Sequence, residues 1–548
     1  MSKTVIIGGV AAGASCAARL RRLDKDADIV LLERGDYISY ANCGLPYHIG
    51  NVIPEQDDLL LMTPELMNNR FDIDVRIRNE VTKIDRDNQT ITILDHNKND
   101  SYEESYDTLV IATGSSPLRP PIPGIESEKI QTLWTVHDAT RLKAQAQTMK
   151  TALIVGGGFI GLEMAENLKE AGVDVTLVEA MDQVMAPLDY EMAQLVHQEL
   201  KNKGIHLILN DGVDSFEDNE QGVKTTLKSG TQIQSDSIIL SIGVRPNSQL
   251  AKDAGLDINQ RGGIKVNDSL QTTDPNIYAM GDVIEVNDFI FGGKTMIPLA
   301  GPANKQGRIV ANNIVGNKEI YKGTQGSSVA KIFDLTVAAT GANEKTLKRL
   351  EKEYESIIIR QNSHAGYYPG AQPMMIKLLF SKDGSQIYGA QIVGNEGVDK
   401  RIDVLASAIR LHASIEDLKE LELAYAPPYS SAKDPINMAG FVAGNVLDGL
   451  AQIATWDEVE THPEAQVLDV REGGELKWYS LPMSFTHIPL GQLRERVNEL
   501  DKEKEVIVFC AIGVRAYNAA RILSQNGYKN VKIYPGGVNF YKAVHLGE

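Results

Sequence analysis

A single cysteine lies in a short segment, SYANCGLPY at residues 39–47, that is rich in turn-forming residues. The chain contains only three cysteines, Cys16, Cys43 and Cys510, so no second cysteine lies near Cys43 in the sequence. A C-x-x-C redox pair is therefore excluded around Cys43. If Cys43 does redox chemistry, its partner sulfur must come from outside the chain.

A glycine-rich segment in the second hundred residues is a candidate dinucleotide site. Gly156, Gly158 and Gly161 form G-x-G-x-x-G between a predicted strand and a predicted helix. Such glycines let the backbone approach a pyrophosphate, and the helix N-terminus supplies N–H groups and positive potential. Glu179 follows roughly 20 residues later, where a carboxylate accepts ribose hydroxyls and repels a 2′-phosphate. The pattern predicts an NADH site; the alternative is a turn that only packs a helix on a sheet.

A similar segment near the start of the chain is less regular. Val10 takes the place of the middle glycine between Gly8 and Gly13. Glu33 ends the next predicted strand, and Asp282 ends another strand in the segment YAMGDV, so a second nucleotide site is predicted. The alternative for Asp282 is a turn carboxylate that binds its own backbone.

Composition restricts the function classes. With 548 residues, the chain should form about three to four domains. A hydrophobic fraction of 43% and a charged fraction of 23% are typical of a soluble globular protein. The formal charge of −18 argues against nucleic acid, although it is compatible with a local basic pocket for a small anion. Few cysteines and no apolar run of bilayer length predict a cytoplasmic protein without a membrane span.

The order of predicted elements gives the fold class. Two βαβ openings, at residues 3–33 and 151–179, indicate an α/β fold with two Rossmann-like dinucleotide domains. After about residue 322, apolar strands alternate with helices in an α+β domain that ends near Leu447. The last hundred or so residues form another α/β unit.

Several motifs together resemble the FAD-dependent pyridine nucleotide-disulfide reductases. Besides the two glycine loops, these are ATG at residues 112–114, GVRPN at 243–247 and YAMGD at 278–282. SYANCGLPY resembles the single-cysteine branch, which contains coenzyme A-disulfide reductases, NADH oxidases and peroxidases, and NADH-dependent persulfide reductases. CAIGVR, Cys510 to Arg515, is similar to the rhodanese active loop. Over nearly its whole length the chain resembles the coenzyme A-disulfide reductase–rhodanese fusions, close to the persulfide reductases.

The resemblance implies a domain order and a set of ligands. It implies an FAD-binding domain at 1–112 and 247–322, an NAD(P)H-binding domain at 113–246, a dimerisation domain at 323–447 and a rhodanese-like domain at 453–548. FAD, NADH or NADPH, and coenzyme A are the expected cofactors, with no metal, in a homodimer. The implied cofactor-binding residues are Gly8, Gly13, Glu33, Arg34, Thr113, Gly114, Asp282, Gly156, Gly158, Gly161, Glu179 and Gly243.

By the same resemblance, Cys43 is the redox nucleophile beside the flavin. It would rest as a thiolate or as a mixed disulfide with coenzyme A. A thiolate needs a pKa lowered by nearby donors or a positive group. Cys16, in contrast, is expected to pack in the core.

The coenzyme A chain is expected to contact residues from both protomers. Arg19 and Arg22 are three residues apart and share a helix face, for which a solvated cationic face is the alternative. The implied contacts are Ser15, Arg19, Arg22, Ser39, Asn42 and the partner's Lys433.

Two tyrosines lie in segments that resemble motifs of the coenzyme A-disulfide reductases. In that family, paired tyrosines reach the redox cysteine across the dimer interface. Tyr367 lies in SHAGYYPGA and Tyr425 in LAYAPPYSSAKDP. A phenol near a leaving thiolate can supply a hydrogen bond or a proton. The neighbouring Tyr368 leaves the assignment of Tyr367 open, and interface aromatics without a catalytic role are the alternative.

The loop from Cys510 to Arg515 would curl backbone N–H groups toward a sulfur and stabilise a thiolate or persulfide. The segment GGELKWYSLPMSFTHIPL departs from the usual rhodanese turns, and Ala516 replaces a common serine. An inactive docking module is the alternative interpretation of this domain.

The predicted function is NADH-dependent reduction of coenzyme A persulfide, polysulfide or coenzyme A disulfide through Cys43, with Cys510 handling sulfane sulfur. One alternative is an NADH oxidase or peroxidase that uses a Cys43 sulfenic acid, although those relatives place a histidine in the first glycine turn and GGVAAGAS has none. The other alternative function is that of a non-catalytic, redox-sensing sulfur carrier.

Overall fold

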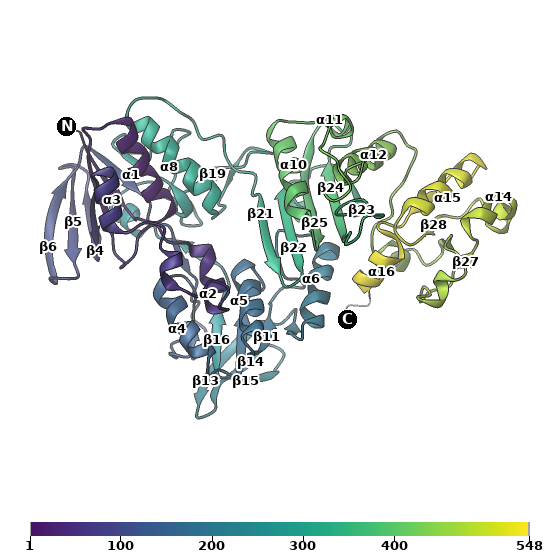
Figure 1. Ribbon diagram of the computed structural model, residues 1–548, viewed down its shortest axis with the longest axis horizontal. Helices are drawn as coiled ribbons and strands as arrows, with labels where there is room; N and C mark the ends of the chain where they lie inside the picture. The colour runs from purple at the N-terminus through teal and green to yellow at the C-terminus, as the bar shows by residue number, and fades with distance from the viewer. Residues whose placement is uncertain (1, 546–548) are drawn as a thin grey trace. The chain divides into compact units, whose positions relative to one another are not determined.

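The computed structural model describes residues 2–545, which form two compact units (Figure 1). The first unit contains residues 2–181 and 208–326, and the second contains residues 182–207 and 327–545. Each unit is described separately below.

The first half of the first unit is built on a parallel sheet with the strand order β18-β7-β1-β2-β3. Its middle strand β1 (Lys3–Ile7) pairs with β2 (Asp28–Glu33) and β7 (Thr108–Ile111), and Val5, Ile6 and Ile7 are buried. Burial of consecutive residues is typical of a parallel sheet that is covered on both faces. The outer strands are β3 (Asp74–Ile77) and β18 (Ile277–Ala279).

Helices α1 (Ala11–Leu23) and α8 (Ala300–Ile314) pack against each other beside this sheet. The smaller elements of this half are η1 (Asn42–Gly44), α2 (Leu45–Ile49), η2 (Gln56–Leu59), α3 (Pro64–Phe71), η3 (Gly281–Val283), α7 (Gln249–Asp253), the antiparallel sheet β4 (Asn79–Asp85), β5 (Thr90–Asp95) and β6 (Asp100–Ser105), and the hairpin β19 (Val286–Asn287) and β20 (Lys294–Thr295).

The second half of the first unit repeats the arrangement. Its sheet has the order β12-β11-β10-β16-β9, with β10 (Thr151–Val155) paired in parallel with β11 (Asp174–Val178) and β16 (Ser237–Leu240). Helix α5 (Phe159–Glu170) follows β10 directly. The remaining elements are β9 (Ile130–Gln131), α4 (Val136–Ala146), β12 (His206–Ile208), and the antiparallel sheet β13 (Val213–Asn219), β14 (Gly222–Leu227) and β15 (Gln232–Ser235). The two predicted Rossmann-like folds are confirmed.

The chain passes between these halves through two strands that pair with each other. β8 (Ser115–Pro117) and β17 (Val244–Pro246) form an antiparallel ribbon. Thr113 Oγ1 donates to the Asn247 carbonyl (2.8 Å), and Asn247 Nδ2 donates to the Thr113 carbonyl (2.9 Å). The segments ATG and GVRPN therefore lie side by side.

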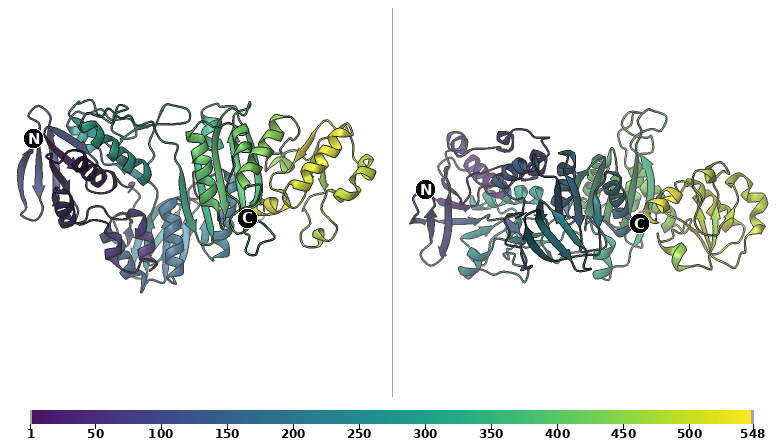
Figure 2. Two further views of the ribbon diagram at one scale, coloured as in Figure 1. Left: turned by 45° about the horizontal axis from the view of Figure 1, so that its top comes forward. Right: turned by 90° about the horizontal axis from the view of Figure 1, so that it is seen from below.

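The second unit contains an antiparallel sheet with the order β21-β22-β25-β24-β23 (Figures 1 and 2). The strands are β21 (Ser328–Ile332), β22 (Leu335–Gly341), β23 (Glu355–Asn362), β24 (Pro373–Phe380) and β25 (Ile387–Gly394). Nearly every residue of β24 and β25 is buried, so both faces of the sheet are covered. The covering helices are α6 (Tyr190–Asn202), α9 (Glu344–Arg349), α10 (Val398–Arg410), α11 (Ile415–Glu420) and α12 (Pro435–Leu447).

A buried lysine attaches the segment around α6 to this sheet. Lys377 on β24 is only 1% exposed and forms ion pairs with Asp189 (2.9 Å), Glu344 (2.6 Å) and Glu191. Burial alone would lower the pKa of Lys377, but the three carboxylates outweigh it and raise the pKa. Gln391 Nε2 also donates to Asp189 (2.6 Å).

The last part of the second unit is a parallel sheet with the order β27-β26-β28-β29. Its strands are β26 (Gln466–Asp469), β27 (Thr486–His487), β28 (Val506–Phe509) and β29 (Val531–Ile533), and Val506–Phe509 are fully buried. The surrounding helices are α13 (Glu458–Thr461), η4 (Glu475–Lys477), η5 (Leu490–Gln492), α14 (Leu493–Arg496), η6 (Val497–Glu499), α15 (Val514–Gln525) and α16 (Gly537–His545). Gln198 of α6 donates to the Ala543 carbonyl in α16 (3.0 Å).

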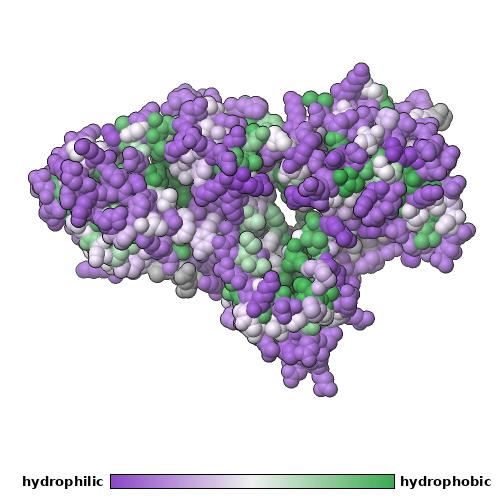
Figure 3. Space-filling model, turned by 180° about the vertical axis from the view of Figure 1, so that it is seen from behind, coloured by the Kyte–Doolittle hydropathy of each residue, from purple (hydrophilic) through white to green (hydrophobic). Residues whose placement is uncertain are grey.

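Most of the surface visible in Figure 3 is hydrophilic, which fits the strongly acidic composition. Among residues 2–545, no helix combines the length and the apolar character that crossing a membrane requires.

Candidate active site

Cys43 lies in the turn η1, immediately before helix α2. The segment that carries it is held to the first glycine loop, because the Ser39 N–H donates to the Gly9 carbonyl (2.8 Å). Ser39 has φ 45°, a left-handed conformation that non-glycine residues rarely adopt. All three cysteines are free, and Cys43 is exposed whereas Cys16 and Cys510 are buried. Cys43 is thus the accessible thiol.

The protein groups around Cys43 oppose its ionisation. Although the side chain reaches solvent, neighbouring atoms displace part of its water and raise the thiol pKa, and the carboxylates of Glu163 and Asp282 raise it further. The protein groups around Cys43 therefore do not supply the lowered thiol pKa that a resting thiolate needs. The main physical reason is the loss of water around the thiol, and the two negative charges add to it.

Glu163 and Tyr47 are site residues that sequence reasoning missed. Tyr47 lies on α2 one turn after Cys43, and its hydroxyl donates to Glu163 Oε1 on α5 (3.5 Å). Burial raises the pKa of Glu163 to about 7, the Tyr47 hydrogen bond opposes this rise, and Glu166 adds to it. Two acidic residues in the otherwise apolar first part of the helix, two and five positions after Gly161, were the available sequence signal.

The two glycine loops have the same local geometry. Gly8 (φ 103°) and Gly156 (φ 108°) start them in the left-handed region, and a Cβ there would meet a backbone oxygen of Ala112 (2.3 Å) or Ser241 (2.5 Å). Val10 and Gly158 occupy the same N-cap position, with φ −91° and −81°. Neither φ is positive, so this position does not need the left-handed conformation that favours glycine.

Each glycine loop is hydrogen-bonded to a carboxylate at the end of the neighbouring strand, β2 for the first loop and β11 for the second. Glu33 accepts the N–H of Gly9 (2.9 Å) and Gly35 (2.8 Å). Glu179 accepts the N–H of Gly157 (2.7 Å) and Met181 (2.9 Å). Arg34, next to Glu33, is exposed.

The loops have the donors that a dinucleotide needs. Helices α1 and α5 begin without a side-chain cap and without an acidic residue in the first turn, so their N-terminal N–H groups remain available to an anion. A Cβ on Gly158 would meet nothing within 4 Å, which leaves room for a ligand at that loop. Gly13 and Gly161 pack closely against the loop, because a Cβ on either residue would lie only 1.8 Å from the Gly8 carbonyl oxygen or 2.0 Å from that of Gly156.

Asp282 lies in η3 at the end of β18, near the crossing ribbon. Ser115 Oγ donates to its carboxylate (3.1 Å), and burial raises the pKa of Asp282. Gly114 (φ 64°) and Gly243 (φ 107°) allow the chain to turn into and out of the ribbon. The structure thus brings Thr113, Gly114 and Asp282 together.

The residues expected at coenzyme A divide between helix α1 and the Cys43 segment. Ser15 Oγ donates to Asn304 of α8 (2.5 Å), and Arg19 Nε donates to Asn312 of α8 (3.0 Å). Arg22 is exposed and lies over the Phe71 ring (5.0 Å). Their spacing of four and three residues places them on one side of α1. Asn42 is exposed beside Cys43.

The two predicted tyrosines meet in the second unit. The hydroxyls of Tyr367 and Tyr425 are 2.7 Å apart, and both side chains are exposed. The hydrogen bond to Tyr367 raises the pKa of Tyr425. Tyr368 instead lies edge-on to His364 (5.7 Å), so Tyr367 is the one paired with Tyr425. Lys433 is exposed just before α12.

Cys510 follows β28 and lies in a cradle of backbone groups. The Gly513 N–H donates to Cys510 Sγ (3.0 Å), and Gly513 (φ 111°) is the residue before α15. The Cys510 side chain is fully buried. The cysteine therefore begins the loop that joins β28 to α15.

Arg515 is engaged by a carboxylate. Its two terminal nitrogens donate to the two oxygens of Glu475 (2.6 and 2.7 Å). This bidentate pair lowers the pKa of Glu475 to about 2 and raises that of Arg515. Glu475 belongs to the segment in which the sequence departs from the usual rhodanese turns, and nearby Trp478 is 92% exposed.

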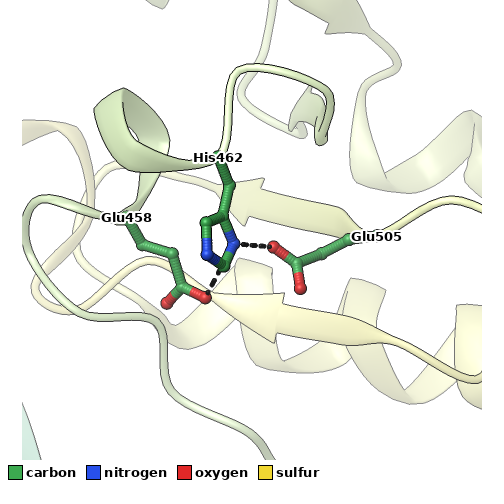
Figure 4. Close-up of side chains that lie close together, drawn as sticks. All are labelled: Glu458, His462 and Glu505. Atoms are coloured by element: carbon green, nitrogen blue, oxygen red, sulfur yellow. Dashed lines mark hydrogen bonds and ion pairs between the residues drawn. The ribbon is translucent and has the colours of Figure 1, made fainter.

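A His–Glu cluster on the last sheet has the ligand types of a metal site. His462, Glu458 and Glu505 converge, and His462 Nδ1 contacts Glu505 (3.0 Å) and Glu458 (3.5 Å) (Figure 4). Lys532, however, pairs with Glu458 and with Glu505 (3.1 Å). The ammonium already balances these carboxylates, so we regard the cluster as an ion-pair network that attaches α13 to the sheet.

Comparison with known families matches the whole arrangement. Residues 2–307 match the pyridine nucleotide-disulphide oxidoreductase family, residues 327–435 match its dimerisation domain, and residues 455–543 match the rhodanese-like domain. The chain belongs to the pyridine nucleotide-disulphide oxidoreductase family and is an oxidoreductase with a C-terminal rhodanese-like domain.

The chain is also similar to individual proteins and solved structures. The chain is 38% identical to a coenzyme A disulfide reductase of Staphylococcus epidermidis, over 81% of this chain and 100% of that protein. A crystal structure of reduced Bacillus anthracis CoADR-RHD is 51% identical, with a TM-score of 0.96 over 99% of this chain and 98% of that one. The structure of a NAD-dependent persulfide reductase from A. fulgidus is 38% identical, with a TM-score of 0.92 over 98% and 100%.

Proposed function

We propose that this chain is an NADH-dependent flavoenzyme that reduces coenzyme A persulfide or coenzyme A disulfide at Cys43. The observation that carries the proposal is the solitary, exposed Cys43 thiol in the same compact unit as two dinucleotide-type loops. With no partner cysteine in the chain close to it in sequence, the second sulfur must belong to the substrate. The names of the relatives agree with such a substrate.

The cofactor assignment follows from the two loops. Bound at them, FAD and NADH would supply hydride transfer and two-electron delivery to sulfur. The α1 loop with Glu33, Thr113 and Asp282 would hold FAD, and the α5 loop with Glu179 would hold the pyridine nucleotide. The Glu179 carboxylate, fixed by two N–H groups, favours NADH because it would repel the 2′-phosphate of NADPH.

The reaction at Cys43 is a thiol exchange followed by reduction. The Cys43 thiolate attacks the outer sulfur of a persulfide, a Cys43–sulfur bond forms, and the carrier leaves as coenzyme A thiolate. Addition of two electrons to the resulting neutral Cys43 persulfide breaks its S–S bond, releases hydrosulfide and regenerates the thiolate. Arg19 and Arg22 would bind coenzyme A phosphates, and the partner's Lys433 would add a third cation.

Cys510 would accept and deliver sulfane sulfur. Its backbone cradle suits a persulfide anion, and covalent linkage to the reductase domains raises the local concentration of that sulfur. We also propose a homodimer, through the dimerisation domain, and a cytoplasmic location, in which three unpaired cysteines persist.

The decisive experiment is anaerobic NADH oxidation by the flavin-loaded protein with coenzyme A persulfide, coenzyme A disulfide or polysulfide. We expect Cys43→Ser to abolish sulfide release and Cys510→Ser to remove only part of it. Cys16→Ser is the matched control, since that buried thiol, with a pKa raised by burial to about 12, should have no role.

Equal and complete loss in the Cys43 and Cys510 variants would contradict this division of roles. Rapid NADH consumption with hydrogen peroxide, but not with the persulfide, would instead support an oxidase or peroxidase that cycles through a Cys43 sulfenic acid.

A further inference from the structure

We propose that Arg401 is a positioning residue for the tyrosine pair: its buried guanidinium joins the loop that carries Tyr367 to the segment that carries Tyr425, and so fixes where the two phenols meet. The inference deepens the proposed function and rests on it, because it explains how the phenols that are expected to assist sulfur release are held in place.

The two tyrosines lie on separate connections of the second unit. Tyr367 lies in the loop 363–372, which joins β23 to β24, and Tyr425 lies in the segment 421–434, which joins α11 to α12. Their side chains are 76% and 45% exposed, so packing around the rings does little to fix them. The 2.7 Å separation of their hydroxyls therefore depends on how the two connections are held together.

Arg401 contacts both connections from the first turn of α10. Its Nη2 atom donates to the Ser363 carbonyl, where the first connection begins (2.9 Å). The same nitrogen lies within hydrogen-bond distance of Ser430 Oγ (3.1 Å) and Asp434 Oδ2 (3.0 Å) in the second connection. One guanidinium thus fastens two connections that are far apart in the sequence.

Ser430 extends this attachment to the backbone beside each phenol. The Ala365 N–H donates to the Ser430 carbonyl (3.0 Å), and the Ser430 N–H donates to the Ala426 carbonyl (3.1 Å). Ala365 lies two residues before Tyr367, and Ala426 directly follows Tyr425. The hydrogen bonds therefore lead from the guanidinium to within two residues of both phenols.

The ion pair of Arg401 and Asp434 makes the attachment rigid. Each of these side chains is only 2% exposed, and Ser430 Oγ donates to the same carboxylate (2.6 Å). Charge-assisted hydrogen bonds between desolvated groups are strong and directional. Two exposed phenols thus project from a fixed, buried base, which spares the substrate complex the entropic cost of ordering them. Lys433, which directly precedes Asp434, starts from the same base.

The test uses the full-length, flavin-loaded protein with NADH and coenzyme A disulfide. Ser430→Ala removes the hydroxyl that contacts both Arg401 and Asp434 while it leaves their ion pair intact. We expect kcat/KM for coenzyme A disulfide to fall about three- to tenfold, because the phenols are less precisely placed. The kcat/KM for NADH should not change, since the reaction with NADH precedes the step that the phenols assist.

Ser381→Ala is the matched control. Ser381 is also a buried serine, its hydroxyl donates to Asp383 (2.7 Å), and it lies at the opposite end of β24 from the Tyr367 loop. Both kinetic constants should therefore equal those of the wild type.

A variant cycle separates positioning from a general structural role. In the Tyr367→Phe, Tyr425→Phe background, adding Ser430→Ala should change kcat/KM for the disulfide by less than about twofold, because no phenols remain to be positioned. A general structural role would instead add its full effect to that of the double-tyrosine variant.

Fluorine NMR of meta-fluorotyrosine at position 425 reports the pair without turnover. Loss of the partner phenol in Tyr367→Phe gives the reference shift. Ser430→Ala should displace the signal toward this reference, whereas Ser381→Ala should leave it in place.

An unchanged kcat/KM for coenzyme A disulfide in Ser430→Ala overturns the proposal, as does a full additional loss in the double-tyrosine background or an unmoved fluorine signal. If Ser430→Ala fails to fold or to retain flavin, Arg401→Lys takes its place, because one ammonium cannot reproduce the guanidinium's contacts to both connections. Wild-type constants in Arg401→Lys would then overturn it. Failure of the proposed function would appear separately, as disulfide reduction that survives Cys43→Ser.

Discussion

At the scale of single residues, the two reactive sulfurs have opposite surroundings. Cys510 is buried and receives a backbone N–H from Gly513, whereas Cys43 is exposed and faces the carboxylates of Glu163 and Asp282. A backbone donor stabilises a sulfur anion without a mobile charge. Carboxylates instead disfavour the anionic form of Cys43.

The bidentate pair of Glu475 and Arg515 gives a prediction at this scale. Glu475 orients Arg515, which lies two residues after Gly513 in the Cys510 loop. We therefore expect Glu475→Gln to lower Cys510-dependent sulfur transfer about three- to tenfold. NADH-dependent reduction of coenzyme A disulfide should be unchanged. Glu472→Gln, an exposed neighbour, is the control. Transfer of sulfur from thiosulfate or polysulfide to cyanide measures the effect, and a parallel loss of both activities would contradict it.

Residue types explain which parts of the site were predictable. Glu33 and Glu179 were found because a strand end fixes where a carboxylate must lie, and the loops they brace follow a local backbone pattern. Glu163 and Glu475 were missed because their partners, Tyr47 and Arg515, are far away in the sequence and no local pattern links them. The raised pKa of Cys43 was missed for the same reason.

At the scale of elements, the two βαβ openings and the order of the later domains followed from hydrophobic periodicity and glycine turns. The attachment of the α6 segment to the antiparallel sheet could not be predicted from these patterns. It depends on Lys377 meeting three carboxylates, of which Asp189 and Glu191 are remote in sequence. A buried lysine in an apolar strand signals an ion pair but not its partner.

Helix α6 carries a buried histidine that should make its surroundings acid-sensitive. His197 Nε2 accepts the Val184 N–H (3.1 Å), and burial lowers its pKa to about 4. In the unfolded segment, the imidazole of His197 binds a proton as the pH falls below its ordinary pKa of 6.5. In the folded segment, the same imidazole stays neutral until the pH approaches 4. Stability is therefore complete above about pH 6.5 and declines as the pH falls toward 4.

Between about pH 7.5 and 4.5, we expect the free energy of local opening of residues 182–207 to fall by about 2 to 3 kcal/mol. Hydrogen–deuterium exchange, corrected for the intrinsic rate at each pH, measures it. His197→Gln should remove most of this dependence, whereas the exposed His206→Gln should not. An unchanged slope in His197→Gln would refute the assignment.

At the scale of the whole molecule, the proposed homodimer predicts complementation. Cys43→Ser should be inactive, and the double variant Tyr367→Phe, Tyr425→Phe should lose about tenfold or more in rate if the phenols assist sulfur release. If the tyrosines act on the partner's cysteine, a heterodimer of these two chains contains one intact site and regains about half of the wild-type activity per dimer.

Separately tagged chains, co-expressed and purified through both tags, provide that heterodimer. Activity no higher than that of the double-tyrosine homodimer would show that each chain uses its own phenols. The wild type carrying the same two tags controls for effects of the tags.

The ribbon of β8 and β17 brings together the two ends of the segment between Thr113 and Asn247, which contains the second glycine loop. The Thr113–Asn247 hydrogen bonds fasten those ends together, and the segment also contacts the rest of the chain through Glu163, which binds Tyr47, and through Asp189, which pairs with Lys377. A module whose two ends lie together can be exchanged, duplicated or permuted without stretching its host. An exchange of this segment would keep the joint at the ribbon but would also replace Glu163 and Asp189, so a transplanted segment must supply both of these contacts anew.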